Sequence, residues 1–301
     1  EQGTRDEVLS APSHPYTKML IGSVPSLTPP NRPIPEVAET ALEAKALNKT
    51  YGRVGFFEKG RLVKAAQDVE LILRRGETLG VVGESGSGKS TVARCVVRLI
   101  DPTSGDINVV GANIAQMAES ELRAYRQKIQ IVFQDPYRSL NPRRTVGQSI
   151  VEGPMNFGLS GTEAQSRAEN LMRVVGLAPE ALTRFPHQFS GGQRQRICIA
   201  RALAMEPRVL IADEAVSALD VSVQAQVLRL LQDVRERYDL AMLFITHDLR
   251  VAAQICDRIM VMQRGVVVEE GRTSEVYANP HHPYTRSLLN AAPGRETNFA
   301  R

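Results

Sequence analysis

The chain has 301 residues, of which 43% are hydrophobic and 23% are charged, and its formal net charge is +4. This ordinary globular composition excludes a disordered, collagen-like or coiled-coil protein. No Lys/Arg block reinforces the weak positive charge, so the sequence does not indicate nucleic acid as a partner. No apolar run approaches the roughly 18–20 residues that span a bilayer.

The first ten residues are polar and charged, unlike a signal peptide, and position 1 is not Met. We therefore expect that Glu1 is not the natural start. The three cysteines, Cys95, Cys198 and Cys256, lie far apart and form no CxxC pair. Their odd number and spacing argue against a disulfide framework or a metal site and favour a reduced, cytosolic protein.

Residues 1–25 and 269–293 form an internal repeat. Aligned without gaps at an offset of 268, they are identical at 11 of 25 positions, including the sequence HPYT. Chance similarity between two surface tails is the alternative. We predict instead that residues 1–25 are the tail of a preceding homologous domain. Residues 12–25 and 280–293 should then form the same helix, begun by proline.

A linker is predicted after the first of these segments, because five prolines follow within eleven residues: Pro25, Pro29, Pro30, Pro33 and Pro35. Such a density sustains neither a helix nor an interior strand. Residues 26–36 are therefore expected to be semi-rigid and extended. A complete domain is expected over residues 37–268, followed by a C-terminal tail over 269–301.

The complete domain alternates between apolar strands and amphipathic helices. Strands are predicted over residues 41–51, 62–73, 77–83, 105–111, 128–134, 208–213 and 241–247. Helices are predicted over residues 89–100, 162–177, 191–206 and 224–238. The first two strands look like edge or antiparallel strands, and the remaining alternation implies a largely parallel α/β sheet. A mostly helical subdomain interrupts it at about residues 140–204.

The sequence GESGSGKS fits the pattern GxxxxGK[ST], between a predicted strand and a predicted helix as that pattern requires. Its glycines let main-chain N–H groups converge on phosphate oxygens, and the helix N-terminus adds partial positive charge. Lys89 supplies charge to the β- and γ-phosphates, and Ser90 supplies a hydroxyl to Mg²⁺. A Gly/Ser-rich turn without a ligand is the alternative. The ATP-contacting residues predicted in this loop are Gly83, Glu84, Ser85, Gly86, Ser87, Gly88, Lys89, Ser90 and Thr91.

An acidic pair, Asp213 and Glu214, ends the apolar strand RVLIAD. Open α/β sheets bind ligands at the carboxyl edge of their strands. Asp213 is therefore predicted to reach Mg²⁺, usually through water, and Glu214 to polarise a water for attack on the γ-phosphate. A solvated acidic pair at a strand end is the alternative, which the upstream phosphate-binding pattern disfavours.

The sequence FSGGQRQRICIARAL resembles the signature motif of ATP-binding-cassette (ABC) ATPases, with Ser190, Gly191, Gly192 and Gln193 as the matching residues. A Ser hydroxyl and Gly amides at a helix start form a second anion-binding element. A plain helix N-cap explains Ser190 but not the residues that follow. The resemblance implies a P-loop NTPase fold with a RecA-like parallel sheet, an antiparallel β subdomain and a helical subdomain. It also implies that two such units sandwich ATP between them.

Other positions match further motifs of the ABC family. Tyr51 has the position of an aromatic residue that stacks on adenine, with an ordinary strand tyrosine as the alternative, and Asp220 ends the D-loop sequence SALD. Gln134 matches the glutamine that senses Mg²⁺ and the γ-phosphate, and His247 matches the switch histidine. The resemblance thus implies Lys89, Gln134, Glu214 and His247 as catalytic residues, and Ser90, Gln134 and Asp213 as residues that hold Mg²⁺.

One departure from the family pattern lies beside the acidic pair. Ala215 and Val216 occupy positions where the family usually has Pro followed by Thr or Ser. These positions shape a turn and carry no catalytic group, so we expect catalytic competence to survive. The geometry of the D-loop is left open.

Two long segments, QDPYRSLNPRRTVGQ and NPHHPYTRSLLNAAP, resemble the oligopeptide/dipeptide branch of ABC importers. This resemblance implies an ATPase at the cytoplasmic face of the inner membrane that powers uptake of peptides, glutathione or nickel. Its expected partners are a second ABC ATPase domain, two transmembrane permease subunits and, indirectly, a solute-binding protein.

Two rival interpretations remain open at this point. A soluble ABC ATPase that acts on nucleic acid or ribosomes usually carries long coiled-coil or basic insertions, and the helical region here is short and not basic. A degenerate domain without hydrolysis is disfavoured because all the expected catalytic side chains are present.

Overall fold

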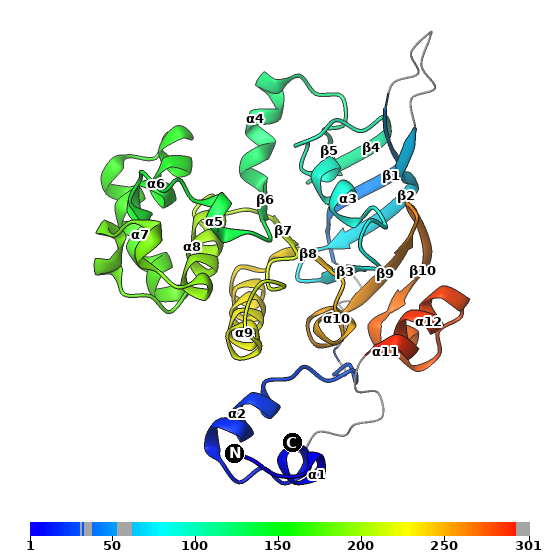
Figure 1. Cartoon of the computed structure of the whole chain (residues 1–301). Helices are drawn as coiled ribbons and strands as arrows, with labels where there is room; N and C mark the ends of the chain where they lie inside the picture. The colour runs from blue at the N-terminus through cyan, green and yellow to red at the C-terminus, as the bar shows by residue number, and fades with distance from the viewer. Residues whose placement is uncertain (31, 33–37, 53–61, 293–301) are drawn as a thin grey trace.

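Two β-sheets, with helices packed beside them, make up the body of the molecule (Figure 1). The computed structural model describes residues 1–30, 32, 38–52 and 62–292. The smaller sheet is antiparallel and has the strand order β2-β1-β4-β5. Its strands are β1 (Thr40–Tyr51), β2 (Val63–Arg74), β4 (Ser104–Val109) and β5 (Ala112–Asn113). The antiparallel pairing predicted for the first two strands is confirmed.

The larger sheet has the strand order β10-β9-β3-β8-β7-β6. Its strands are β3 (Thr78–Val82), β6 (Ile129–Val132), β7 (Val209–Asp213), β8 (Ala241–Thr246), β9 (Arg258–Gln263) and β10 (Val266–Arg272). Neighbouring strands are parallel from β6 to β9, and β10 runs antiparallel to β9 at the edge. The predicted largely parallel α/β sheet is confirmed.

The side chains of the larger sheet alternate between two hydrophobic cores. On β8, Met242 and Phe244 belong to one core, whereas Leu243 and Ile245 belong to the other. The first core extends into the helical layer, and the second includes the apolar side chains of the antiparallel sheet. Burial of both faces explains why these strands are continuous apolar runs in the sequence.

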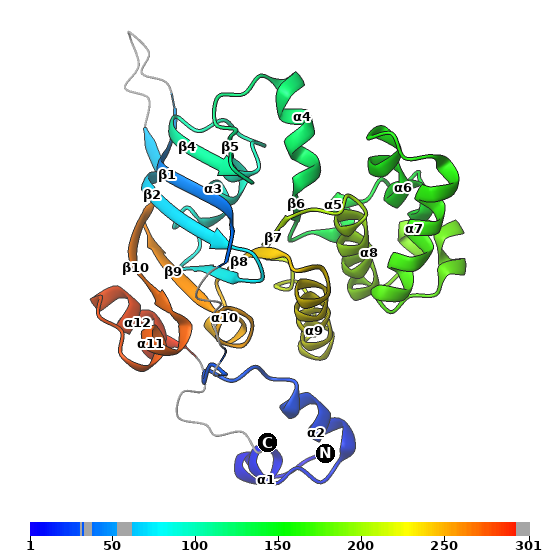
Figure 2. The same cartoon turned by 180° about the vertical axis from the view of Figure 1, so that it is seen from behind.

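Helices cover the sheets and form a separate layer beyond β6 (Figures 1 and 2). The helices next to the sheets are α3 (Lys89–Val96), α4 (Glu119–Lys128), α9 (Val221–Tyr238) and α10 (Leu249–Ile255). The helical layer contains α5 (Pro136–Ser139), α6 (Val146–Asn156), α7 (Gly161–Val174) and α8 (Gly191–Leu203), with 3-10 turns at Pro179–Thr183 and Pro186–Gln188.

Some elements differ from the sequence predictions. Helix α3 ends at Val96 instead of residue 100, because Arg98 adopts a left-handed backbone with φ of 54°. No prediction covered α4, β5, α10, β9 or β10. Strand β10 runs through residues 268 and 269, so the segment expected to be a tail begins inside the core sheet.

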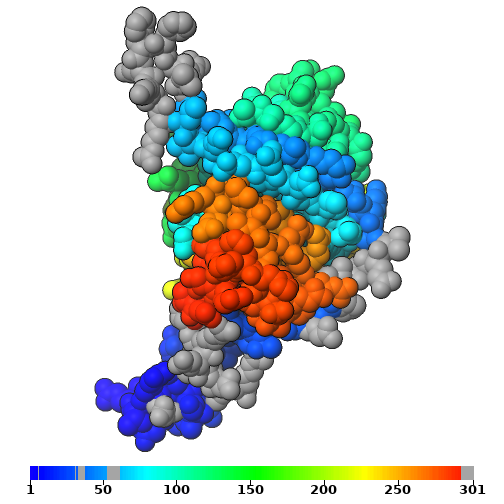
Figure 3. Space-filling view, turned by 90° about the vertical axis from the view of Figure 1, so that its right-hand side faces the viewer, coloured from blue at the N-terminus to red at the C-terminus, as the bar shows by residue number. Residues whose placement is uncertain are grey.

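The internal repeat is also a structural repeat. Helices α1 (Arg5–Ser10) and α2 (Pro15–Gly22) correspond in register to α11 (Thr273–Ala278) and α12 (Pro283–Ala291). A helix begun by proline is confirmed in both segments, but it starts at Pro15 and Pro283 and is shorter than the predicted residues 12–25 and 280–293. We call the two segments the first tail (residues 1–25) and the second tail (residues 269–292). The second tail packs on the strands, whereas the first tail projects from the body and contacts it through α2, which lies against α9 (Figure 3).

The linker after the first tail runs against the end of α10. The side chain of Gln254 donates hydrogen bonds to the carbonyls of Ser26 and Thr28, at 2.9 and 3.0 Å. Arg32 donates to the carbonyl of Ile255 at 2.8 Å. Residues 31 and 33–37, and with them the expected start of the complete domain, lie outside the described residues.

Candidate nucleotide-binding site

The loops that carry the predicted chemistry all follow strands that end at one edge of the larger sheet. Val82 pairs with Thr246, and Asp213 pairs with Ile245, in parallel register. Four parts of the predicted site therefore share the carboxyl edge of the sheet. They are the phosphate-binding loop after β3, Gln134 after β6, the acidic pair at the end of β7, and His247 after β8. Open α/β sheets bind ligands at this edge.

The phosphate-binding loop depends on glycine at three positions. Gly83, Gly86 and Gly88 have φ angles of 148°, 80° and 108°, where other residues are strained. A Cβ atom at Gly83 would lie 2.2 Å from the Met262 carbonyl oxygen, and one at Gly88 would lie 2.1 Å from that of Ala65. Gly88 begins α3, so the loop leads into a helix N-terminus that favours anions.

The other residues of the phosphate-binding loop differ in how exposed they are to solvent. Glu84, Ser85 and Gly86 are exposed, whereas Ser87 is buried and Thr91 is half-buried. The exposed stretch is open to a ligand, and the buried part fixes the loop to the body.

Lys89 is buried and folded back onto the loop. Its ammonium donates hydrogen bonds to the carbonyls of Gly83 and Glu84, both at 2.8 Å. Burial lowers the pKa of Lys89, and the carboxylates of Glu214, Asp213 and Glu84 oppose that shift. A buried cation bound to carbonyl oxygens can be transferred to phosphate oxygens of a ligand at little cost in desolvation.

Ser90 and Asp213 form a pair of oxygen ligands. The Ser90 hydroxyl donates to Asp213 Oδ1 at 2.9 Å. Burial raises the pKa of Asp213, and the hydrogen bond from Ser90 partly offsets that shift. Within the described residues, no group of three or more His, Cys, Asp and Glu side chains could hold a metal alone. A hydroxyl and a carboxylate that share one position fit Mg²⁺, which takes one or two protein oxygens and completes its shell with water and phosphate.

Glu214 has a left-handed backbone, with φ of 49°. Its amide donates to the carbonyl of Ile245 at 3.0 Å, which holds this uncommon conformation. The carboxylate lies 3.5 Å from Nδ1 of His247, whose side chain is half exposed. The structure thus brings together the two side chains that were predicted to orient water and to contact the γ-phosphate.

A hydrogen-bond chain links Gln134 to the same place. The amide group of Gln134 donates to the hydroxyl of Ser217 at 3.3 Å, and that hydroxyl donates to the carbonyl of Glu214 at 3.0 Å. Ser217 was not among the predicted site residues, although it lies inside the recognised D-loop sequence. Ala215 and Val216, the departure from the family pattern, are buried and leave this turn intact.

Tyr51 ends β1 and is 41% exposed. The ammonium of Lys49 lies 5.1 Å from the centre of its ring. Its neighbour Thr50 pairs with Lys64 on β2. The next residue of β2, Ala65, contacts Gly88 through its carbonyl oxygen. The register therefore places Tyr51 near the end of the phosphate-binding loop, with its ring open to a ligand.

The signature residues lie elsewhere. Ser190 is the N-cap of α8, and its side chain and that of Gln193 hydrogen-bond each other's amides, at 3.3 and 3.0 Å. Gly192 packs so closely on Val223 that a Cβ atom would lie 2.2 Å from its Cγ1, whereas Gly191 is free of such contact. Helix α8 stands in the helical layer, apart from α3 in both views (Figures 1 and 2). Asp220, at the start of α9, is exposed.

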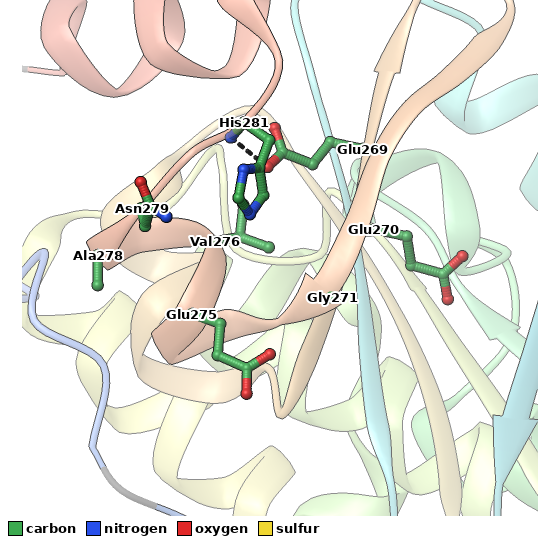
Figure 4. A pocket seen from close by; sticks show the side chains of 8 residues that line it. All are labelled: Glu269, Glu270, Gly271, Glu275, Val276, Ala278, Asn279 and His281. Carbon is green, nitrogen blue, oxygen red and sulfur yellow. Dashed lines mark hydrogen bonds between the residues drawn. The ribbon is translucent and has the colours of Figure 1, made fainter.

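A pocket lies within the second tail, between β10 and α11 (Figure 4). Its lining residues are Glu269, Glu270, Gly271, Glu275, Val276, Ala278, Asn279 and His281. None of these is a predicted nucleotide contact, and the acidic lining does not suit a phosphate.

The three cysteines are buried and free. Burial raises the pKa of Cys95 and of Cys198 to about 11, and it also raises that of Cys256. These thiols are therefore unreactive at neutral pH. No helix in the part of the chain that the structure describes is long and apolar enough to cross a membrane.

Comparison with known proteins identifies this arrangement. A family model described as "ABC transporter" matches residues 66–217. A second, described as "Oligopeptide/dipeptide transporter, C-terminal region", matches residues 1–55 and 268–298. The chain therefore belongs to the ABC transporter family and is one of its ATP-binding, ATP-hydrolysing members. The predicted family and fold class are confirmed.

Relatives and solved structures agree with that assignment. The chain is 51% identical over 260 residues to the probable peptide ABC transporter ATP-binding protein y4tS of Sinorhizobium fredii, covering 85% of this chain and 74% of that protein. It is 44% identical to the glutathione import ATP-binding protein GsiA of Escherichia coli K12, covering 100% of this chain and 53% of GsiA. The chain thus spans about half the length of GsiA.

Two solved ATP-binding cassettes share the fold. The cassette MJ0796, in a dimeric post-hydrolysis state bound to ADP and Pi, matches with a TM-score of 0.69 and 30% identity over 77% of this chain and 98% of that chain. The protein cbiO1 from Clostridium perfringens, part of a cbiONQ transporter complex, matches with a TM-score of 0.68 and 29% identity over 80% of this chain and 91% of that chain.

Proposed function

We propose that the chain powers a membrane importer for peptides or related small solutes, glutathione among them. The observation that carries this proposal is the combination of a complete nucleotide edge with a second tail of the oligopeptide/dipeptide transporter type. The names of the relatives support the same substrate class. The tail match also favours transport over the alternative of a soluble ATPase acting on nucleic acid or ribosomes.

Hydrolysis in this proposal is carried by side chains at the carboxyl edge. Glu214 orients and deprotonates the attacking water, while Lys89 and His247 stabilise charge on the γ-phosphoryl group. Gln134 connects this reaction to the helical layer through Ser217. Ser90 and Asp213 would hold Mg²⁺, with Gln134 as a further predicted ligand, and the ion would supply neutralising charge to the phosphate oxygens.

A second ATPase unit completes the site. The signature residues Ser190–Gln193 stand apart from the phosphate-binding loop of their own chain, which supports a role on the nucleotide of a partner unit. We infer that this partner is a homologous domain preceding residues 1–25 in a tandem polypeptide. The structural repeat of the two tails and the match of one family model to both of them support this inference.

The helical layer is the proposed docking surface for two permease subunits, which an external solute-binding protein would supply with substrate. Three large hydrophobic side chains are exposed on it, namely Tyr137 at 62%, Met155 at 47% and Phe185 at 37%. Tyr137 lies three residues after Gln134, so this surface is close in sequence to the nucleotide sensor. Such docking would hold the chain at the cytoplasmic face of the inner membrane.

The decisive variant is Glu214→Gln. The amide cannot accept the proton of the attacking water, so the turnover of the two-unit complex should fall by about 10²–10⁴-fold while ATP binding persists. Phosphate release and binding of a fluorescent ATP analogue measure the two quantities. Near-normal turnover of Glu214→Gln would contradict the catalytic assignment, and loss of binding would show a folding defect instead.

The two-unit requirement has a separate test. Because each site needs a signature segment from the other unit, the dilute chain should be a slow ATPase whose specific activity rises with concentration or on addition of the preceding unit. Turnover is measured against protein concentration. Full, concentration-independent activity of a dilute monomer would contradict the requirement.

Adenine stacking offers a binding test that does not depend on the partner. Tyr51→Ala should weaken ATP binding by roughly 5- to 150-fold, the range expected from removing one base–aromatic stack. Equilibrium binding to the chain alone measures it, with Tyr51→Phe as the control that keeps the ring. Unchanged affinity of Tyr51→Ala would make Tyr51 an ordinary strand residue.

A further inference from the structure

The second tail touches the nucleotide edge at two points, both through tyrosine hydroxyls. The hydroxyl of Tyr284, in the HPYT sequence, accepts a hydrogen bond from the amide of Glu84 at 3.1 Å. The hydroxyl of Tyr277 donates to the carbonyl of Leu249 at 2.6 Å. Glu84 is the second residue of the phosphate-binding loop, and Leu249 is the first residue of α10, two residues after His247.

The contact of Tyr284 fixes a particular peptide group. The peptide between Gly83 and Glu84 presents its N–H to Tyr284 and its C=O to the ammonium of Lys89, at 3.1 and 2.8 Å. The φ of 148° at Gly83 leaves this peptide without the steric limits that other residues have. The hydrogen bond to Tyr284 therefore restrains the peptide group whose carbonyl accepts from Lys89.

The contact of Tyr277 fixes the helix behind the switch histidine. Tyr277 is half-buried against the core. Burial of its hydroxyl raises its pKa well above the ordinary value, so the hydroxyl remains a hydrogen-bond donor. Thr273 adds a second connection, because its hydroxyl donates to the carbonyl of Cys256, the C-cap of α10, at 2.8 Å. Helix α11 thus holds α10 at both ends.

The second tail is itself held in place by hydrogen bonds to β10. The carboxylate of Glu269 on β10 accepts a hydrogen bond from the amide of His281 at 2.8 Å (Figure 4). It also accepts one from the amide of His282 at 3.0 Å. The ring of His282 then caps α12 by accepting from the amide of Tyr284 at 3.2 Å. Three hydrogen bonds therefore connect the edge strand β10 to helix α12, which carries the hydroxyl that contacts the phosphate-binding loop.

We propose that the second tail positions the nucleotide site, with Tyr284 setting the phosphate-binding loop and Tyr277 setting the start of α10 beside His247. This proposal rests on the proposed function, since it assigns a task within the same ATP site. Both tyrosines are positioning residues that act through the main chain of the loops they contact. The two should affect different steps, because one loop binds the nucleotide and the other stabilises the reacting phosphoryl group.

The test compares three single-atom variants of the whole chain. Tyr284→Phe keeps the packed ring and should weaken binding of an ATP analogue by about 2- to 10-fold, the effect of one lost hydrogen bond. Tyr277→Phe should leave binding nearly unchanged and lower kcat in the two-unit complex by a similar factor. Tyr16→Phe, at the equivalent position of the first tail, is the matched control and should leave the binding affinity of this chain unchanged.

Two further measurements separate this proposal from a general loss of structure and from failure of the proposed function. The ¹⁵N–¹H resonance of Glu84 should shift in Tyr284→Phe and stay in place in Tyr16→Phe, whether or not nucleotide is present. Lys89→Ala should abolish ATP binding if the proposed function holds. Equal affinity and an unmoved Glu84 resonance in Tyr284→Phe would overturn the positioning role, while binding unaffected by Lys89→Ala would overturn the proposed function instead.

Discussion

The two tails share their local structure but not their surroundings. In the first tail the carboxylate of Glu1 accepts from the amides of Ser13 and His14, at 2.7 and 3.3 Å, as Glu269 does from the equivalent residues of the second. His14 caps α2 by accepting from the Tyr16 amide, just as His282 caps α12. Yet Tyr16 is 59% exposed, whereas its counterpart packs on the core and reaches the phosphate-binding loop.

This difference shows which features short-range sequence encodes and which need the rest of the domain. Both copies have three local features: a glutamate that accepts from two backbone amides, a histidine that caps the helix, and a proline at the helix start. The residues of each feature lie within about one turn or one loop of each other. The contact with the nucleotide edge requires a body to dock on. Leu9 stands where the second tail has Tyr277, so the first tail keeps only one of the two tyrosine hydroxyls.

The largest expected contrast between the tails is in packing energy. Leu289 is buried, and Leu289→Ala should lower the free energy of unfolding of the main domain by about 2–5 kcal/mol. The equivalent Ile21→Ala should leave the main transition in place and loosen only the first tail. Calorimetry measures the main transition, and limited proteolysis of residues 1–25 measures the tail. Equal shifts of the main transition in both variants would show that the first tail is part of the body.

A smaller contrast is expected at the two glutamates. Burial acts to raise the pKa of Glu269, but the nearby Thr285 hydroxyl and the hydrogen bonds from the amides of His281 and His282 outweigh it, so the pKa lies below the ordinary 4.5. A depressed carboxyl pKa stabilises the folded state above pH 4.5, and that contribution is lost as the pH falls through the folded-state value.

Glu269→Ala should therefore destabilise the main domain at pH 7 by roughly 1–2 kcal/mol, and the difference from wild type should shrink on acidification. Glu1→Ala should leave the main domain unchanged at every pH, although hydrogen bonds from Ser13 and Thr17 lower the pKa of Glu1 to about 2. Thermal unfolding between pH 3 and 7 checks both variants. A pH-independent effect of Glu269→Ala would assign its role to packing instead of charge.

The sequence predicted those parts of the fold and site that rest on local pattern. The parallel sheet, the helix starts at Ser190 and Lys89, and the residues of the carboxyl edge all follow from apolar periodicity and short motifs. Strand β10 escaped prediction because it crosses the expected boundary at residue 268. Strand β9 (RIMVMQ) was missed although it is an apolar run of strand length. The contacts of Tyr277 and Tyr284 join residues 28 and 200 positions apart. Local sequence cannot give such partners, although the recurrence of HPYT marked the segment as special.

The tandem arrangement and the positioning role together make one further prediction, with the smallest expected effect. In the isolated chain Tyr16 contacts no phosphate-binding loop, so Tyr16→Phe should be silent there. In a two-unit polypeptide the first tail would dock on the preceding unit as the second tail docks here, and Tyr16 would contact the amide equivalent to that of Glu84.

The same substitution should then weaken ATP binding at only one of the two sites, by about 2- to 10-fold. Because Tyr16 corresponds to Tyr284 and not to Tyr277, kcat should change less in this variant than in Tyr277→Phe. Binding isotherms of the two-unit protein, fitted with two sites, measure the effect. Two unchanged sites would mean that the first tail has kept its fold without keeping the docking that the second tail displays.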